Sequence, residues 1–408
     1  MNESSQSQGT MMTQYRSAFS KLALSTVLFT LPLNAALAQD ATAVAERLKT
    51  VLAAQNMTLG WTSVTGDASN AVLEGASIAV VGEGKPFSIG KVTLSGITEE
   101  NRGYKIETVS TEPYSFSEGT AKIEVSPLTL GNVTLPATDS TDLLASFLMY
   151  ETANLDNVSV KIGDKQAFQM TNFQAEVTPP VDGKAMEFTG SAEKFTADLS
   201  LVEDPQSKAA IDALGYQNIS GNFQMEGSWQ PTDGRMALTS YDVTVDNAGT
   251  LGMTFDLGGY TLDFLKSVQE LQKKMAAQPE GSDDSAQGLA MLGLMQQLTF
   301  NGATVRFDDD SVTNKVLEYL AKQQNMTAKD IANQAKAIVP FLMMELNNPE
   351  LATQVTSAVT AYLDNPKSIE IAAKPASPVP FALLAASGMS NPKDLPKTLG
   401  LTVTANQD

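Results

Sequence analysis

The pattern that most constrains the fold is an alternation of apolar and polar residues over residues 59–260. In FTADLSL, residues 195–201, every second side chain is apolar, and FQMEGSW, residues 223–229, has the same period. A period of two places alternate side chains on opposite faces of a strand. Strands of a parallel sheet are covered on both faces and apolar throughout, whereas these strands are apolar on one face only. The pattern therefore predicts a large antiparallel sheet with one covered face and one face in water.

Turn residues divide this region into hairpins. DNAG at 246–249 separates two alternating segments, and QPTDGR at 230–235 is a second turn. A weak internal repeat aligns VGEGKPFSIGKVTL at 81–94 with IGDKQAFQMTNFQA at 162–175, and LTLGNVTLP at 128–136 resembles its second half. Two interpretations remain open. Either one hairpin unit is reused along a growing sheet, or strand-turn-strand segments simply share a composition.

Both ends of the chain change to a helical period. Residues 41–55 have apolar residues at helical spacing, and the same spacing returns after residue 262. Thr327 can cap one C-terminal helix with Asp330 in its first turn, and Pro340 predicts a kink or break in that helix. The predicted C-terminal helices lie at 263–277, 287–298, 312–324, 328–346, 348–364 and 381–386, and the returning strands at 300–307, 368–373 and 401–405.

These periods together predict an α+β fold. We expect a large, twisted antiparallel β-sheet that carries an N-terminal helix, with a mainly helical C-terminal part packed on it. The predicted division is a signal peptide at 1–38, an antiparallel β-rich region at 39–261, and a helical region with returning β-strands at 262–408.

The N-terminus has the pattern of a secretory signal. Arg16 and Lys21 precede a short apolar segment at 22–33, and Ala36 and Ala38 supply the small residues of a cleavage site after Ala38. Twelve residues are too few to span a bilayer comfortably, although an uncleaved anchor is the alternative. The true start codon is Met1, Met11 or Met12. The pattern predicts a periplasmic protein.

Composition excludes several kinds of partner. The chain has a formal net charge of −19 and no cluster of Lys and Arg, which argues against nucleic acid and against charge-driven adsorption to anionic membranes. No later apolar run is long enough for an integral membrane span in the mature chain. Cysteine is absent, so stability must come from a hydrophobic core.

The segment VRFDDDSVTN, residues 305–314, is the best candidate for metal chemistry. A calcium loop of the EF-hand type needs a glycine at its sixth position and a glutamate at its twelfth. Counted from Asp308, those positions hold a threonine and Tyr319. The other interpretation is a strand, a tight turn and a helix capped by Asp310 or Ser311. The missing loop chemistry favours this second interpretation, and we assign no metal ligand.

Catalytic motifs are also lacking. The chain has neither His nor Cys, which removes the commonest general base and the usual catalytic triads. Ser-x-x-Lys occurs three times without the companion motifs of penicillin-binding enzymes, at Ser88/Lys91, Ser191/Lys194 and Ser390/Lys393. We therefore assign no catalytic and no cofactor-binding residue and expect no cofactor. A hydrolase that uses a carboxylate pair distant in sequence stays open.

The apolar sheet face allows two interpretations. It is either a core covered by the C-terminal helices or a groove that holds acyl chains. Methionine, which suits adaptable apolar surfaces, clusters in the helical region, but apolar patterning more commonly means packing. The methionines concerned are Met275, Met291, Met295, Met326, Met343 and Met344.

Several strand segments resemble those of a known class of protein. PFSIGKVTLSGI, LGNVTLP, LDNVSVKI and FNGATVRFDDDSV are similar to the repeated strand segments of AsmA-like envelope proteins and related periplasmic families, over residues 60–310. The resemblance implies long, curved antiparallel sheets with an apolar inner face and a role in lipid traffic or outer-membrane homeostasis. It supplies no catalytic residue.

The expected function is that of a non-enzymatic periplasmic envelope protein that binds lipid or another apolar ligand, or assists envelope assembly. Its expected partners are a lipid or apolar ligand and an envelope protein. The alternative is a structural or protein-interaction module without a small ligand, and the second alternative is a carboxylate-dependent hydrolase.

Cleavage after Ala38 is directly testable. Intact mass and N-terminal sequencing of protein from a periplasmic extract should give Gln39 as the first residue. Replacing Ala36 and Ala38 by Glu should leave the precursor uncleaved, because the signal peptidase requires small residues at both positions. A mature N-terminus elsewhere would contradict this site.

Overall fold

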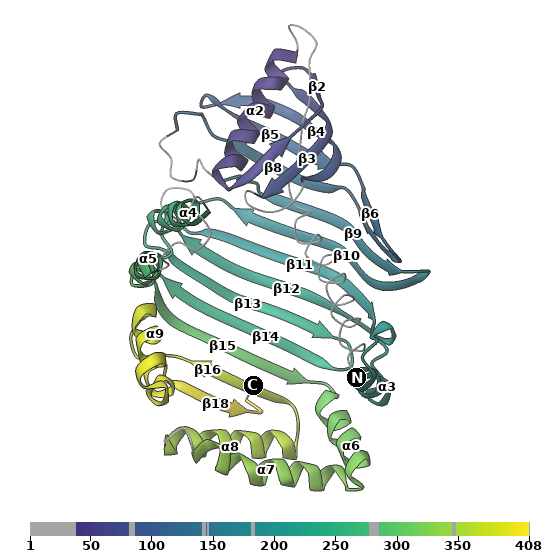
Figure 1. Ribbon diagram of the computed structural model, residues 1–408, viewed down its shortest axis with the longest axis vertical. Helices are drawn as coiled ribbons and strands as arrows, with labels where there is room; N and C mark the ends of the chain where they lie inside the picture. Colours follow the sequence, from purple (N-terminus) through teal and green to yellow (C-terminus); the bar gives the residue numbers. More distant parts are fainter. Residues whose placement is uncertain are drawn as a thin grey trace. The chain divides into compact units, whose positions relative to one another are not determined.

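Figure 1 shows the computed structural model of the chain. The described residues are 38–80, 86–140, 144, 147–180, 184–276, 285–344 and 348–407. The predicted signal peptide, except Ala38, lies outside them. The chain forms two compact units, Met1–Val177 (unit 1) and Thr178–Asp408 (unit 2). No helix among the described residues is long and apolar enough to cross a membrane.

The described part of unit 1 starts with helix α2, Ala38–Ala54, and continues as antiparallel strands. The strands pair in the order β3, β4, β5, β8, β9, β10, with β1 and β2 on the outer edge of β3 and the β6–β7 hairpin beside β9. Their bounds are β1 Met57–Gly60, β2 Ser63–Gly66, β3 Asn70–Val80, β4 Phe87–Glu100, β5 Gly103–Thr111, β6 Tyr114–Glu118, β7 Ala121–Val125, β8 Leu128–Leu135, β9 Thr152–Ile162 and β10 Lys165–Thr178.

The core of unit 1 lies between α2 and one sheet face. Val44, Leu48 and Leu52 are almost fully buried at helical spacing, and they pack in one cluster with strand residues such as Leu73 and Ile106. The guanidinium of Arg47 donates hydrogen bonds to the carbonyl oxygens of residues 136 and 137 after β8. The predicted N-terminal helix is therefore confirmed, and here it closes the apolar face of the sheet.

The repeated segments of unit 1 share a backbone feature. Gly90, Asn132 and Asn172 have φ values of 78°, 52° and 52° and lie inside β4, β8 and β10. In the alignment of the repeat, these residues occupy the same or the next position. A left-handed residue inside a strand is typical of a bulge, which increases the local twist. Only Gly90 lies at such a bulge, in the pairing of β4 with β3, whereas the pairing keeps its register across Asn132 and Asn172.

Unit 2 contains the remaining strands and most of the helices. The bounds of its strands are β11 Met186–Asp198, β12 Asn218–Gln230, β13 Arg235–Val245, β14 Gly249–Gly258, β15 Thr299–Asp309, β16 Ser368–Ala373, β17 Val379–Pro380 and β18 Leu401–Ala405. Its helices are the 3-10 turns η2 Leu199–Leu201 and η3 Pro392–Asp394, with α3 Pro205–Leu214, α4 Leu262–Ala276, α5 Ser285–Met295, α6 Val312–Gln324, α7 Ala328–Met344, α8 Pro349–Asp364, α9 Phe381–Ser390 and α10 Leu395–Thr398.

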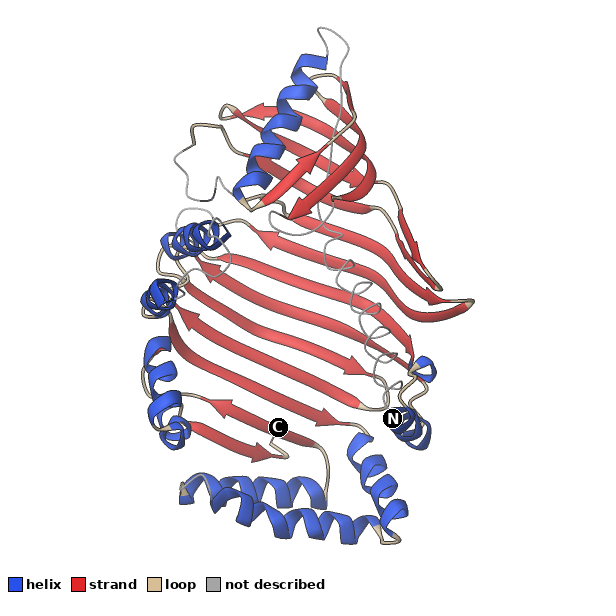
Figure 2. Cartoon of the chain, in the orientation of Figure 1, coloured by secondary structure: helices blue, strands red, loops and turns tan. Residues whose placement is uncertain are grey.

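The sheet of unit 2 is antiparallel throughout its described pairs. It runs β11, β12, β13, β14, β15, β16, β18, with β17 beside the start of β15. Figure 2 shows the helices of this unit at the strand ends and along the edge formed by β18. The predicted fold class, a large antiparallel sheet with an N-terminal helix and helices in the C-terminal part, is confirmed.

Two local predictions need correction or completion. Helix α3 lies inside the region predicted to be strands only, although Asp204 as N-cap, Pro205 at the first turn and Gly215 as C-cap signal it clearly. Helix α7 continues through Pro340 without a break. Its predicted capping box is confirmed, because the amide of Asp330 donates to Thr327 Oγ1 and the amide of Thr327 donates to Asp330 Oδ2.

Bulges keep the apolar residues of unit 2 on one face. In β13 the apolar side chains change from even to odd numbers, from Met236 and Leu238 to Tyr241 and Val243. The pairing with β12 moves from Ser240 to Leu238, so Thr239 is an extra residue that absorbs this change. Similar shifts lie between Ala192 and Phe195 in β11 and at Asn301 in β15. Each change of the apolar residues between even and odd positions therefore coincides with an extra residue in the strand pairing.

Because the extra residue compensates for the change of position, deleting it should be less harmful than deleting a residue from a regular strand. Deleting Thr239 should be tolerated within about 1 kcal/mol, because Met236, Leu238 and Tyr241 would then alternate regularly without a bulge. Deleting Thr254 from the regular strand β14 should cost several times more, because Phe255 and Leu257 would turn to the polar face. Urea unfolding measures both, and equal losses would contradict this account.

Candidate functional site

The three aspartates of the 305–314 segment serve three separate purposes. Asp308 accepts hydrogen bonds from Arg306, with Nη2 2.7 Å from Oδ1. Asp309 Oδ1 accepts the backbone N–H of Thr313 at 2.9 Å. Asp310 is exposed, and its backbone N–H donates to Ala248 O at 3.0 Å. The three carboxylates therefore have different partners and do not converge.

The predicted strand, turn and helix are confirmed, but the capping residue is different. Strand β15 ends at Asp309 and helix α6 begins at Val312. Ser311 occupies the N-cap position without a side-chain cap, because its hydroxyl donates to Asn247 O in the β13–β14 turn. Asp309, and neither Asp310 nor Ser311, caps the first turn. Within the described residues, no group of three or more His, Cys, Asp or Glu side chains could hold a metal ion.

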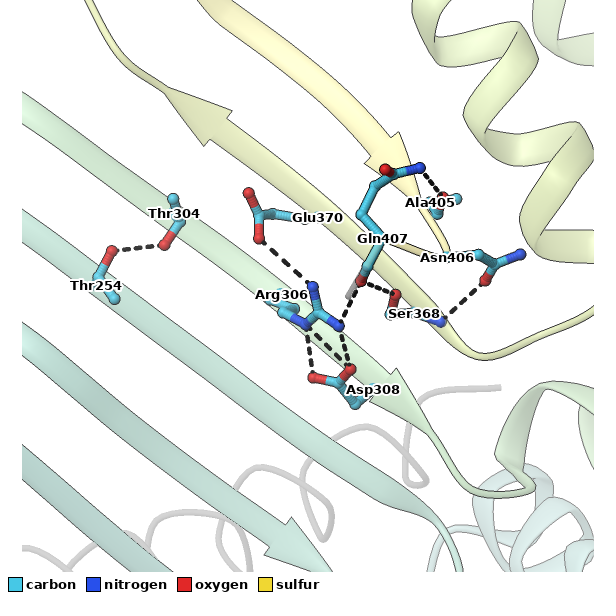
Figure 3. Close-up of polar contacts among 9 residues, drawn as sticks. All are labelled: Thr254, Thr304, Arg306, Asp308, Ser368, Glu370, Ala405, Asn406 and Gln407. Atoms are coloured by element: carbon cyan, nitrogen blue, oxygen red, sulfur yellow. Dashed lines mark hydrogen bonds and ion pairs between the residues drawn. The ribbon is translucent and has the colours of Figure 1, made fainter.

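Arg306 is the centre of a polar cluster on one sheet face (Figure 3). Besides Asp308, its guanidinium approaches Glu370 Oε2 at 3.8 Å and donates to the carbonyl oxygen of Gln407 at 3.0 Å. Asn406 accepts from the amide of Ser368, and its side-chain amide donates to the carbonyl oxygens of Ala361 in α8 and of Asn365 just after it. These contacts join β15, β16 and the residues after β18, so we interpret the cluster as structural.

Three residues of the Ser-x-x-Lys pairs, Ser88, Lys91 and Ser390, have local partners. Ser88 Oγ donates to Ala76 O, while Lys91 forms an ion pair with Glu112, with Nζ 3.1 Å from Oε1. Ser390 Oγ donates to Ala386 O within α9. The lysine and serine of the first pair therefore have separate local partners.

The opposite face of the unit 2 sheet is apolar. Directly paired residues of an antiparallel sheet point to the same side, so the strand register defines each face. One apolar row crosses six strands and a second crosses the last four of them. The first row contains Phe223, Val243, Leu251, Phe307, Ile369 and Ala405, and the second contains Met253, Val305, Ile371 and Val403. The face therefore has a continuous apolar surface.

This apolar face is open in the middle. Leu251, Val305 and Ile371 are 40%, 44% and 48% exposed, whereas Leu73 and Ile106 in the core of unit 1 are 0% exposed. The described side chains of unit 2 therefore leave the centre of the face accessible. The same alternating pattern forms a closed core in unit 1 and an open surface in unit 2.

The margins of this face are covered. Tyr362 and Ala358 of α8 pack with Phe307, Ile369 and Val403 near the β18 edge. At one set of strand ends, Trp229 Nε1 donates to Tyr260 O at 2.8 Å, and the ring of Tyr260 contacts that of Phe264 in α4. Helices therefore border an accessible apolar surface, which we name the open face.

A comparison with known protein families gives a match to part of the chain. A family model described as an uncharacterized protein matches residues 242–406, which run from the second half of β13 through β18. No curated protein matches the chain. The matched segment lies within unit 2 and includes most strands of the open face. The description of the family states no function, so a functional assignment rests on the geometry of that face.

The cap at Asp309 is testable. Asp309→Ala should lower the free energy of unfolding by about 1 kcal/mol, because the amide of Thr313 loses its acceptor, whereas Asp309→Asn should retain most of the stability. Asp310→Ala is the matched control and should change stability by less than about 0.5 kcal/mol. Chemical denaturation measures all three, and a larger loss for the Asp310 variant would contradict the assignment.

Proposed function

We propose that the chain is a non-enzymatic envelope protein of the periplasm and that unit 2 binds a lipid or another ligand with acyl chains on its open face. The observation that supports this most directly is the exposure of Leu251, Val305 and Ile371 in the middle of a continuous apolar surface. Monomeric soluble proteins rarely leave large contiguous apolar patches in water, and such patches commonly mark binding sites.

The shape of the surface favours a long apolar ligand. Neighbouring strands lie ~4.8 Å apart, so the first row, which crosses six strands, spans roughly 24 Å. Each CH₂ group removed from water contributes about 0.8 kcal/mol. An unbranched chain that follows such a row therefore gains more than a compact ligand that covers only two or three side chains.

The carboxyl groups support a non-enzymatic role over a hydrolase. Among the described residues, each carboxyl group whose pKa departs clearly from its ordinary value has it lowered. Hydrogen bonds from Lys122 and Lys161 lower the pKa of Glu124 in this way, and a hydrogen bond from Lys91 lowers the pKa of Glu112. A glycosidase-type general acid needs a raised pKa instead, which these residues do not offer.

A protein-interaction module is the second candidate. Tyr241 and Phe223 pack edge to face on the open face, with ring centroids 5.1 Å apart. Aromatic residues are enriched where proteins bind each other, so this end of the face also fits a protein partner. A partner that binds in place of acyl chains would need to cover the same central residues.

The first test is native mass spectrometry of the mature protein, purified gently from periplasm, with lipid extraction of the same sample. We expect an acyl-chain species at a defined stoichiometry. Val305→Glu should lower the affinity for that species at least about tenfold, because it places a charge where the chain would be buried. Thr402→Glu, which adds the same charge on the polar face, should retain the ligand.

A clean mass of the protein without ligand, together with an empty lipid extract, would remove the ligand from the proposal. A stable protein partner that Val305→Glu releases and Thr402→Glu retains would then favour the interaction module.

A further inference from the structure

Two short helices at one end of the unit 2 strands are apolar on all sides. Figure 1 shows α5 and α9 next to each other at these strand ends, and they are in contact. In α5, nine of eleven residues are Ala, Gly, Leu or Met, and in α9 eight of ten are Ala, Gly, Leu, Met or Phe. A helix with this composition is normally buried in a protein core or in a membrane.

These helices are nevertheless exposed. Leu289 of α5 is 71% exposed and Met389 of α9 is 89% exposed, and Met291, Leu292 and Leu383 are about half exposed. We name this surface the helical ledge. The ledge is as apolar as a buried surface, but its side chains are exposed to water. It therefore requires a partner that removes it from water.

The charge pattern narrows the choice of partner. In a chain of which 18% is charged, the segments 285–305 and 375–392 contain no Asp, Glu, Lys or Arg. The ledge therefore offers no cation to the phosphates of anionic lipids, and the net charge of −19 opposes adsorption to them. Within the two helices, burial of apolar side chains is therefore the driving force, and the lysines of this region lie on the neighbouring elements α4, η3 and α10.

The side-chain types favour lipid over protein. Specific protein interfaces are anchored by Trp, Tyr and Arg, and Leu is under-represented among their anchors. The ledge has none of the three anchor types and relies on Leu and Met. Flexible, unbranched side chains such as Met adapt to an irregular apolar environment, which the boundary of a bilayer provides.

The ledge is continuous with the open face. Phe381, the first residue of α9, packs edge to face against Phe300 of β15, with ring centroids 6.4 Å apart. Its backbone N–H also donates to Leu298 O at 3.0 Å. Phe300 pairs with Leu257, whose side chain belongs to the apolar side of the sheet. An acyl chain could therefore pass from the ledge to the open face without crossing polar surface.

We propose that α5 and α9 dock unit 2 on the surface of an electrically neutral bilayer, which is the source or the destination of the acyl chains on the open face. The role of the bilayer as source or destination rests on the proposed function, in which acyl chains bind to the open face. Helices of 11 and 10 residues are too short to span a membrane. They lie in the interface with their apolar side chains at the boundary between headgroups and acyl chains.

Vesicle flotation of the full mature protein tests the docking. The protein should float with phosphatidylcholine vesicles equally at low and high salt, and phosphatidylglycerol in the vesicles should not increase the floated fraction. Leu289→Glu with Met389→Glu should lower vesicle affinity at least about tenfold, because each substitution replaces an inserted side chain by a charge. Both positions are exposed, so the variant should fold like the wild type.

The matched control is Ala209→Glu with Ala213→Glu on α3. Both residues are exposed, and the pair changes the net charge equally. This control should float like the wild type. A wild-type protein that stays unbound, a ledge variant that floats like the control, or binding that requires phosphatidylglycerol would each overturn the docking. A wild-type dimer that the ledge variant converts to monomers would identify a second copy as the occupant and overturn it as well.

The two proposals fail separately. A protein that carries an acyl species but does not float would overturn the docking and leave the ligand in place. A protein that floats but yields no acyl species would overturn the ligand and leave the docking in place. If both proposals hold, Val305→Glu loses the ligand and still floats.

Discussion

The structure of unit 2 depends on the phase of the side-chain alternation along each strand. Because the period is two, a shift of one residue moves every later side chain to the other face. The apolar residues of β11, β13 and β15 change parity within the strand, and each change coincides with a bulge in the pairing. Without these bulges, half of each strand would turn its apolar residues to the polar side, and no continuous apolar face would exist.

An apolar face has a different fate in each unit because the helices differ in where they pack. Helix α2 places six apolar residues against the face of unit 1 and buries it. The described helices of unit 2 pack on strand ends, on an edge and on each other, as α7 does on α8 and α5 on α9. The open face and the helical ledge both follow from this arrangement. They are apolar surfaces that lack a covering layer from the described part of the chain.

The fold class follows from local patterns, and the candidate site does not. The alternation, the helical spacing of residues 41–55 and the capping box at Thr327 are encoded within a few residues, so they are readable from the sequence. The cap at Asp309 was assigned to the wrong residue because the hydroxyl of Ser311 bonds to Asn247, 64 residues away. The choice between core and open face depends on where distant helices pack. The exposure of α5 and α9 also depends on distant packing, although their lack of charge is a visible signal in the sequence.

The position of β18 has a consequence for the order in which the chain folds. Its pairing with β16 and the contacts of Asn406 and Gln407 with α8 and Arg306 complete one edge of the unit 2 sheet. Until residues 401–407 have been synthesised, β16 lacks its outer neighbour, and the carbonyls at the end of α8 lack the amide of Asn406. Unit 2 therefore completes its fold only after translation of this region.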